Sequence, residues 1–125
     1  FYERLIETLL EAGIEPYPTL YHWDLPQSLQ DLGGWQNRTV AEYFGEYAGL
    51  LAAILSDRVK YWTSINEPWV IANLGHKTGE MAPGLKDEKI SLQVAHNLLL
   101  AHGWAVQAVR SVRSSNRLGI VLILF

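Results

Sequence analysis

The sequence predicts an α/β fold in which parallel strands alternate with helices. Three helical patterns and three strand-like apolar runs alternate along the 125 residues, and this order implies parallel strands joined by right-handed crossovers. Doubly wound sheets and (β/α)8 barrels both have such an order. The long loops, at residues 21–38 and 69–86, follow strands, whereas the connections from helix to strand are short. Because a barrel carries its functional loops at the carboxyl ends of its strands, the sequence favours a partial TIM (β/α)8 barrel.

The chain begins with a predicted helix and an irregular strand. Apolar residues recur at i, i+3, i+4 and i+7 over residues 2–10, which is typical of an amphipathic helix, and Gly13 is placed to end it. Residues 14–21 predict a strand. Pro16 and Pro18 make that strand irregular or partly unpaired, because proline has no N–H to donate to a ladder.

A polar loop with a short helical turn is expected over residues 25–35, followed by a second helix and strand. Thr39 and Glu42 fit a capping box for a helix over residues 40–55. Residues 59–65 are rich in β-branched and aromatic side chains and predict a buried strand.

The last third predicts a long loop, a helix and a strand. Residues 69–86 contain glycine and proline, and residues 91–113 carry an apolar stripe that includes His102, which we expect to be a core residue. Residues 118–125 are apolar throughout, as in a parallel strand buried on both faces. No strand follows it, so we expect residues 1–125 to be a fragment of a single longer α/β domain.

Composition excludes several classes of function. The net charge is −3 with both signs scattered, so we expect neither nucleic acid nor a membrane as partner. The absence of cysteine rules out disulfides but leaves the compartment open, with the cytoplasm our expectation. No run approaches the roughly 20 apolar residues that cross a bilayer.

Neither metal-ligand spacing nor a glycine-rich phosphate loop is present, so we expect no metal and no cofactor. The oligomeric state stays open.

The tripeptide Asn66-Glu67-Pro68, directly after the 59–65 strand, is the most informative feature. A carboxyl group at a strand end is costly unless it has a partner or a function. Glu67 is therefore a candidate general acid, with an ion pair or a helix cap as the structural alternative. Pro68 disfavours the α region for Glu67 and is expected to hold it extended. Strict alternation puts Asn66 and Glu67 on opposite faces, so both reach one site only if the strand ends or bulges there.

His22 and Trp23 end the preceding strand and are expected beside Asn66 and Glu67. An indole offers a flat apolar face for a sugar ring, and an imidazole offers a hydrogen bond. Taken alone, this pair and the further aromatics Trp35 and Trp69 are better explained by packing than by ligand binding.

Four motifs then occur in order along the chain: YHWDLPQ at residues 21–27, GGWQNR at 33–38, DRVKYWTSINEPW at 57–69, and APG at 82–84 followed by HNLLLAHG at 96–103. Together they closely resemble glycoside hydrolase family 1, the β-glucosidase family. The resemblance implies that the three strands are the third to fifth of a (β/α)8 barrel.

The resemblance also implies residue roles. Glu67 matches the general acid/base of a retaining β-glycosidase, and Asn66 matches the residue that binds the sugar 2-hydroxyl. His22 and Trp23 match residues around the cleaved sugar, and Trp69 matches an aromatic on the leaving-group side. The implied partner is a small β-glycoside or oligosaccharide. The family's nucleophilic carboxylate has no counterpart in this sequence, so we expect the isolated chain to be inactive.

Three alternatives remain open at this level. A 6-phospho-β-glycosidase differs in phosphate-binding residues late in the barrel. A non-catalytic carbohydrate-binding homologue would lack the second glutamate. A purely structural α/β domain explains the periodicities but not the ordered motifs.

Overall fold

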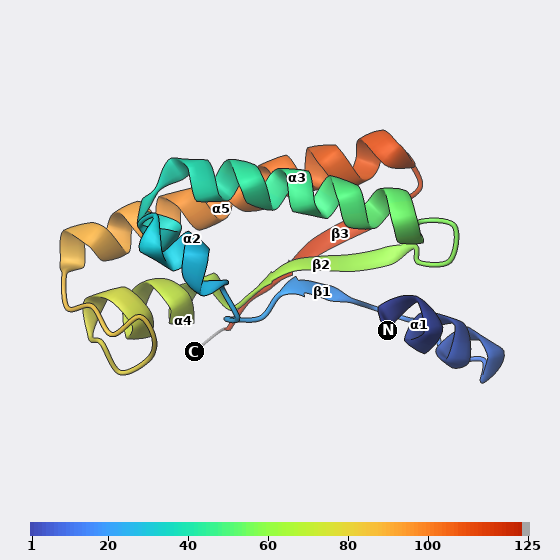
Figure 1. Cartoon of the computed structure of the whole chain (residues 1–125), viewed down its shortest axis with the longest axis horizontal. Coiled ribbons are helices and arrows are strands. Elements are labelled where there is room, and N and C mark those ends of the chain that lie inside the picture. Colours follow the sequence, from blue (N-terminus) through green and yellow to red (C-terminus); the bar gives the residue numbers. More distant parts are fainter. Residues whose placement is uncertain (124–125) are drawn as a thin grey trace.

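A computed structural model of the chain describes residues 1–123 as a three-stranded sheet with helices packed on it (Figure 1). In chain order the elements are α1 (Tyr2–Glu11), β1 (Thr19–Tyr21), α2 (Gln27–Asp31), the 3-10 helix η1 (Gly34–Gln36), α3 (Arg38–Leu55), β2 (Tyr61–Asn66), α4 (Pro68–Ala72), the π-helix η2 (Asn73–Lys77), α5 (Glu88–Val112) and β3 (Arg117–Val121).

The sheet confirms the predicted α/β class with parallel strands. Its order is β1-β2-β3, and β2 pairs in parallel with both neighbours. All three strands therefore end at the same edge of the sheet. The loop to α2 leaves β1 at that edge, and α4 leaves β2 there (Figure 1). The last residues of the central strand therefore lie between the ends of its two neighbours.

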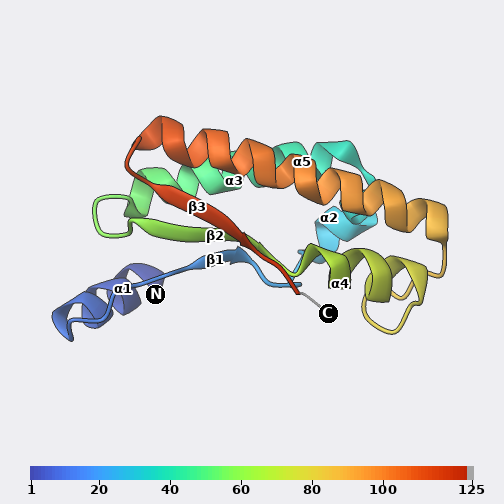
Figure 2. The same ribbon diagram turned by 180° about the vertical axis from the view of Figure 1, so that it is seen from behind.

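The helices α3 and α5 lie side by side over one face of the sheet, as both views show (Figures 1 and 2). Small residues let them approach closely: Ala48 and Ala52 of α3 and Ala101 and Ala105 of α5 are fully buried. Trp62 of β2, also fully buried, packs in the same core. Burial of this apolar layer is the main source of stability, at roughly 25 cal/mol for each Å² removed from water.

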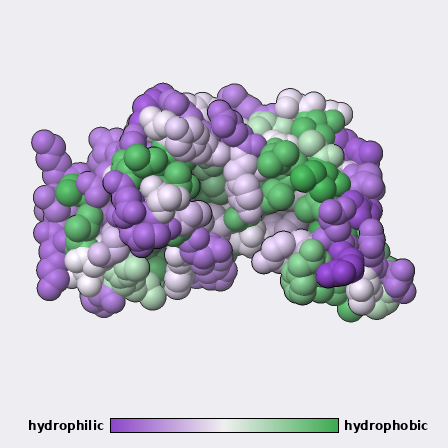
Figure 3. Space-filling model, viewed as in Figure 1, coloured by the Kyte–Doolittle hydropathy of each residue, from purple (hydrophilic) through white to green (hydrophobic). Residues whose placement is uncertain are grey.

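Several apolar residues of the predicted helical stripes are exposed instead of buried. In α1 only Ile6 is buried, and on α3 the side chains of Tyr47 and Ile54 are each 43% exposed. On α5, Leu99 is 60% exposed. These positions lie on helix faces that no other element covers among residues 1–123. Figure 3 shows apolar patches interrupting the polar surface on one side of the molecule.

The first strand is shorter than the predicted 14–21. Only Thr19–Tyr21 forms regular strand, although the carbonyl of Pro18 still accepts a 2.9 Å hydrogen bond from the Thr63 N–H. The two prolines account for this, because neither has an N–H for the ladder.

Two helix starts differ from the prediction. The cap of α3 is Asn37, whose Oδ1 accepts a 3.0 Å hydrogen bond from the Thr39 N–H, so the expected Thr39 capping box is wrong. The helix α5 begins at Glu88, three residues before the expected start, because the carboxylate of Asp87 accepts from the Ile90 N–H. Both caps satisfy N–H groups that have no partner within the helix.

The predicted loop at residues 69–86 and the last predicted strand also need correction. Residues 68–77 form α4 and η2, because Pro68 is pre-organised for the first position of a helix. The strand β3 ends at Val121, and residues 124 and 125 of the predicted strand lie outside the described residues. The short helical turn expected within 25–35 is confirmed as α2. No helix among residues 1–123 combines the length and the apolarity needed to span a bilayer.

The close contact between α3 and α5 gives a testable pair of substitutions. A Cβ added at Gly45 would lie 2.9 Å from the Cβ of Trp104, whereas one added at Gly49 would lie 3.4 Å from the Cβ of Ala108. Alanine gains roughly 1 kcal/mol in helix propensity at either position, but overpacking costs about 1–3 kcal/mol. We expect thermal unfolding to show a lowered Tm for Gly45→Ala and an equal or raised Tm for Gly49→Ala. Equal shifts in both variants would contradict this packing.

Candidate functional site

The candidate site is built around one peptide group at the end of β2. The Asn66 carbonyl accepts a 3.0 Å hydrogen bond from the indole Nε1 of Trp23, and the Glu67 N–H donates a 2.9 Å bond to the Val121 carbonyl. Both polar atoms of the Asn66–Glu67 peptide are therefore held, one by the loop after β1 and one by β3. The expected proximity of Trp23 to Asn66 and Glu67 is confirmed.

Glu67 adopts a left-handed conformation, with φ 46° and ψ 67°, so the expected extended conformation is wrong. The chain must turn from β2 into α4 within this residue, and its carbonyl accepts a 2.9 Å hydrogen bond from the Val70 N–H. Pro68 disfavours the right-handed α region for the residue before it. The left-handed region is the conformation that still makes the turn.

Two of the candidate residues have a strained backbone. Among residues 1–123, Trp23 and Glu67 are the non-glycine residues with positive φ, at 74° and 46°. Such angles cost on the order of 1–3 kcal/mol each and collect at functional sites. The strain therefore points to the same place as the sequence motifs.

The carboxylate of Glu67 has no structural role within the described residues. It forms no ion pair with any basic group of residues 1–123. Glu67 is the N-cap residue of α4, but its side chain makes no capping hydrogen bond. The residue is only half-buried. Both structural alternatives, an ion pair and a helix cap, are thus unsupported here. The group is left accessible at the carboxyl edge of the sheet.

Strict alternation stops at Asn66, where β2 ends, and a β-bulge precedes that end. Thr63 pairs with Gly119 and Asn66 pairs with Val121, so three residue steps on β2 oppose two on β3. A bulge of this kind bends a strand and re-aims the side chains that follow it. Asn66 and Glu67 can share a site only if the strand ends or bulges there, and β2 does end there, because Glu67 leaves it in a left-handed turn.

The other predicted site residues lie around this edge with differing exposure. His22 is exposed, and its ring packs edge-on against the Trp23 ring with centroids 5.1 Å apart. Trp69, in the first turn of α4, is 45% exposed. Trp35 is 2% exposed and packs against Tyr21 and Phe44, so it is a packing residue.

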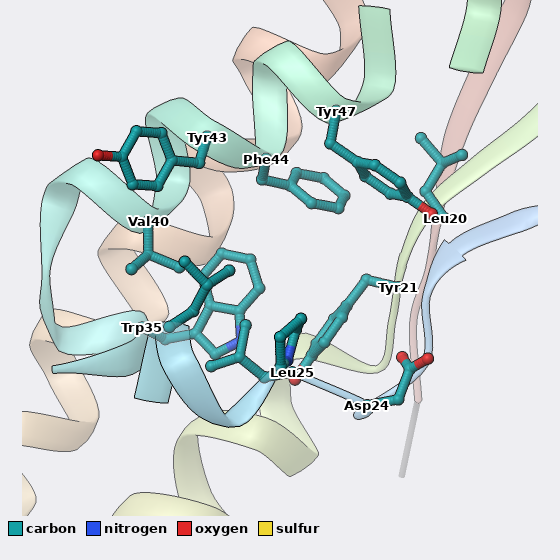
Figure 4. Close-up of a pocket in the computed structure, with 11 residues that line it drawn as sticks. Leu20, Tyr21, Asp24, Leu25, Trp35, Val40, Tyr43, Phe44 and Tyr47 are labelled. Atoms are coloured by element: carbon teal, nitrogen blue, oxygen red, sulfur yellow. The ribbon is translucent and has the colours of Figure 1, made fainter. Parts of the chain in front are cut away.

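Two cavities flank the loop that follows β1. One, of about 280 Å³, lies between β1, α2 and α3 and is lined mainly by aromatic and aliphatic side chains, with Asp24 among them (Figure 4). The other, of about 260 Å³, is lined by Trp23, Gln27, His76 and the 82–83 segment among others. Glu67 lines neither cavity. Only the second adjoins the candidate site, through Trp23.

Two buried polar residues that support the site loops escaped sequence analysis. Asn97 of α5 donates hydrogen bonds of 2.9 and 3.0 Å to the carbonyls of Trp35 and Gln36, which pins η1 to α5. His76 bonds the Ile71 carbonyl at 2.8 Å through Nδ1, and burial lowers the pKa of its imidazole. Each bonds to backbone carbonyls, and a backbone partner leaves no signal in the sequence before the loops are placed.

The two histidines of α5 have separate environments. His96 is exposed, whereas His102 is half-buried and bonds the Ser64 hydroxyl through Nδ1 at 2.7 Å. His102 is therefore a polar bridge and not the apolar core residue that its position on the stripe predicts. Among residues 1–123, no three His, Asp or Glu side chains are grouped so as to hold a metal ion.

Comparison with known proteins matches this architecture to one family. The family model described as Glycosyl hydrolase family 1 matches residues 1–124. The chain is 50% identical over 121 residues to Beta-glucosidase A of Thermotoga maritima, and 52% identical over 122 residues to Beta-glucosidase A of Acetivibrio thermocellus. Those alignments cover 97% and 98% of this chain but 27% of each relative.

Solved structures agree with the sequence comparison. The T. maritima family 1 β-glucosidase superposes with a TM-score of 0.95 at 49% identity, over 97% of this chain and 27% of that one. The same enzyme has been solved in complex with glucoimidazole, with a TM-score of 0.93 over 95% of this chain and 27% of that one. The three parallel strands and their helices thus match part of a family 1 barrel. On these matches, the chain belongs to glycosyl hydrolase family 1.

Proposed function

We propose that this chain carries the general acid/base of a retaining β-glycosidase of the β-glucosidase type, and that Glu67 is that residue. The observation that carries the proposal is the Glu67 carboxylate, held at the end of the central strand by a strained backbone and used by no ion pair or cap among residues 1–123. A group kept in this position at a cost in strain is best explained by chemistry.

The proposed reaction has two steps at the anomeric carbon. In the first, Glu67 gives its proton to the glycosidic oxygen while a second carboxylate, about 5–5.5 Å away, attacks the anomeric carbon and the aglycone leaves. In the second, Glu67 removes a proton from water as the water oxygen bonds to the anomeric carbon and the ester to the second carboxylate breaks. The second carboxylate comes from another part of the domain.

Neighbouring side chains suit the binding of a sugar. Trp23 and Trp69 expose 37% and 45% of their surface at the carboxyl edge, which offers flat apolar faces for pyranose rings. His22 and Asn66 supply hydrogen-bonding groups for hydroxyls. We propose Trp23, His22 and Asn66 for the cleaved sugar and Trp69 for the leaving-group side. The complex of the T. maritima relative with glucoimidazole supports a glucoside-like substrate.

We further propose that residues 1–125 are part of a single (β/α)8 catalytic domain and contribute its third to fifth strands. The chain spans 27% of the length of its curated relatives. Within residues 1–123, β1 and β3 each leave one edge unpaired, and α3 exposes apolar side chains. Neighbouring strands and helices of a closed barrel would cover such edges and faces.

Substitution of Glu67 by glutamine in the full-length protein tests the proposed role. Glutamine keeps the shape but has no proton to give, so we expect kcat/KM for an alkyl β-glucoside to fall by about 10²–10⁴-fold. For 2,4-dinitrophenyl β-glucoside, whose leaving group departs without a proton, kcat/KM should change far less. The measurement is steady-state hydrolysis of both substrates.

Glu46→Gln is the matched control, because Glu46 is an exposed glutamate on α3, away from the site. We expect it to hydrolyse both substrates as the unsubstituted protein does. Near-normal hydrolysis of the alkyl glucoside by Glu67→Gln would sink the assignment.

The 125-residue chain on its own is expected to hydrolyse no aryl β-glucoside. It lacks the proposed second carboxylate, and half of a two-carboxylate site forms no glycosyl-enzyme. The assay is release of a nitrophenol by the purified chain, with a Glu67→Ala chain as the control. Turnover that disappears in the Glu67→Ala chain would show that residues 1–125 suffice for catalysis.

A further inference from the structure

The orientation of Glu67 depends on the bulge that precedes it. Between the pairs Thr63–Gly119 and Asn66–Val121, β2 contains one residue more than β3. After the bulge the backbone is fastened again, since the Glu67 N–H bonds the Val121 carbonyl at 2.9 Å. If the extra residue were taken up elsewhere, Glu67 would meet β3 in another register and its side chain would point in another direction.

Ser64 lies inside this bulge and is bonded on two sides. Its side chain is fully buried, and its Oγ lies 3.2 Å from the carbonyl oxygen of Gly119 and 2.7 Å from Nδ1 of His102. Gly119 is the β3 residue at which the register shift begins. One hydroxyl therefore joins the bulged strand to β3 and to α5.

The chemistry of the three groups fixes which of them donates. Both hydrogen bonds form at once only when the Ser64 hydroxyl gives its one proton to the Gly119 carbonyl and His102 donates its Nδ1–H to the Ser64 oxygen, because a carbonyl oxygen only accepts. Burial, together with the charge of Arg110, lowers the pKa of His102. A neutral imidazole with its proton on Nδ1 makes this bond, so the serine and histidine form a directed chain from α5 to β3.

This pair is not arranged as a nucleophile and its base. In such a pair the histidine nitrogen accepts the serine proton and the serine oxygen faces the substrate. Here the Ser64 oxygen has no exposed surface, and its proton points to the Gly119 carbonyl. The arrangement suits holding a backbone, and its place in the bulge identifies which backbone is held.

We propose that Ser64 and His102 are positioning residues that lock the β2 bulge and thereby set the direction of the Glu67 carboxyl group. This inference rests on the proposed function of Glu67. Neither residue touches the substrate. Loss of either should impair proton donation by Glu67 more than it impairs the binding of sugar.

The test compares four variants in the full-length protein on the alkyl and 2,4-dinitrophenyl β-glucosides. Ser64→Ala removes the hydroxyl, and Ser64→Thr restores it. His102→Asn places an amide nitrogen near the position of Nδ1, whereas His102→Gln reaches toward the position of Nε2. Each pair thus contains a variant that breaks the chain of hydrogen bonds and a conservative one that keeps it.

We expect Ser64→Ala and His102→Gln to lower kcat/KM for the alkyl glucoside on the order of 10²-fold, as a misplacement of about 1 Å does. The dinitrophenyl glucoside should be hydrolysed nearly as by the unsubstituted protein, since its leaving group needs no proton. Ser64→Thr and His102→Asn should recover most of the lost activity. Normal hydrolysis of the dinitrophenyl glucoside also shows that a variant is folded.

Two results would overturn the inference alone: unchanged activity on both glucosides, or equal losses on both without rescue by the conservative variants. Should Ser64→Ala not fold, the two His102 variants decide between these outcomes. Failure of the proposed function is seen separately, as an unsubstituted protein without glycosidase activity or a Glu67→Gln variant with no preference for the activated substrate.

Discussion

The peptide group between Asn66 and Glu67 is the point on which the candidate site depends. Its carbonyl is bonded to the Trp23 indole from the β1 side, and its N–H is bonded to Val121 on the β3 side. Because β2 is the central strand, the layer of α3 and α5 that packs on the sheet fixes this peptide as well. The site thus adjoins the core, and the Glu67 backbone is held by the same packing and hydrogen bonds that hold the central strand.

Much of the fold could be predicted because it follows from short-range patterns. The alternation of apolar runs identified the parallel α/β class, and the strand around residues 59–65 lies within a residue or two of β2. The exposed outer faces of α1 and α3 could not be predicted, since an apolar stripe does not reveal whether a neighbour lies beside it. The Asn37 cap was missed because the spacing of Thr39 and Glu42 also fits a capping box. In that box the Glu42 carboxylate would accept from the Thr39 N–H, the group that the Asn37 side chain binds instead.

The proximity of Trp23 to Asn66 was predicted from the sequence, whereas the backbone conformation of Glu67 was not. The positions of Trp23 and Asn66 at the ends of successive predicted strands placed them side by side, which the hydrogen bond between them confirms. The left-handed turn at Glu67 was not foreseen, because the rule for residues before proline names what is disfavoured and does not choose between extended and left-handed conformations. The choice is made by α4, which starts at Pro68 and buries Val70, Ile71 and Ala72. Tertiary packing therefore set an angle that local sequence left open.

The strain at Trp23 and Glu67 shows how stability and chemistry are balanced in this chain. A glycine at position 67 would adopt a φ of 46° without steric cost, yet it would remove the carboxyl group. At roughly 1–3 kcal/mol per residue, the strain is a large fraction of a typical net stability of about 5–15 kcal/mol. It persists because the two bonds to the Asn66–Glu67 peptide and the burial of α4 leave the backbone no relaxed alternative. The hydrogen bonds of Ser64 add a third restraint, two residues before Asn66 in the same strand. The restraints converge on a single carboxylate that no ion pair within residues 1–123 requires, which supports the role proposed for Glu67.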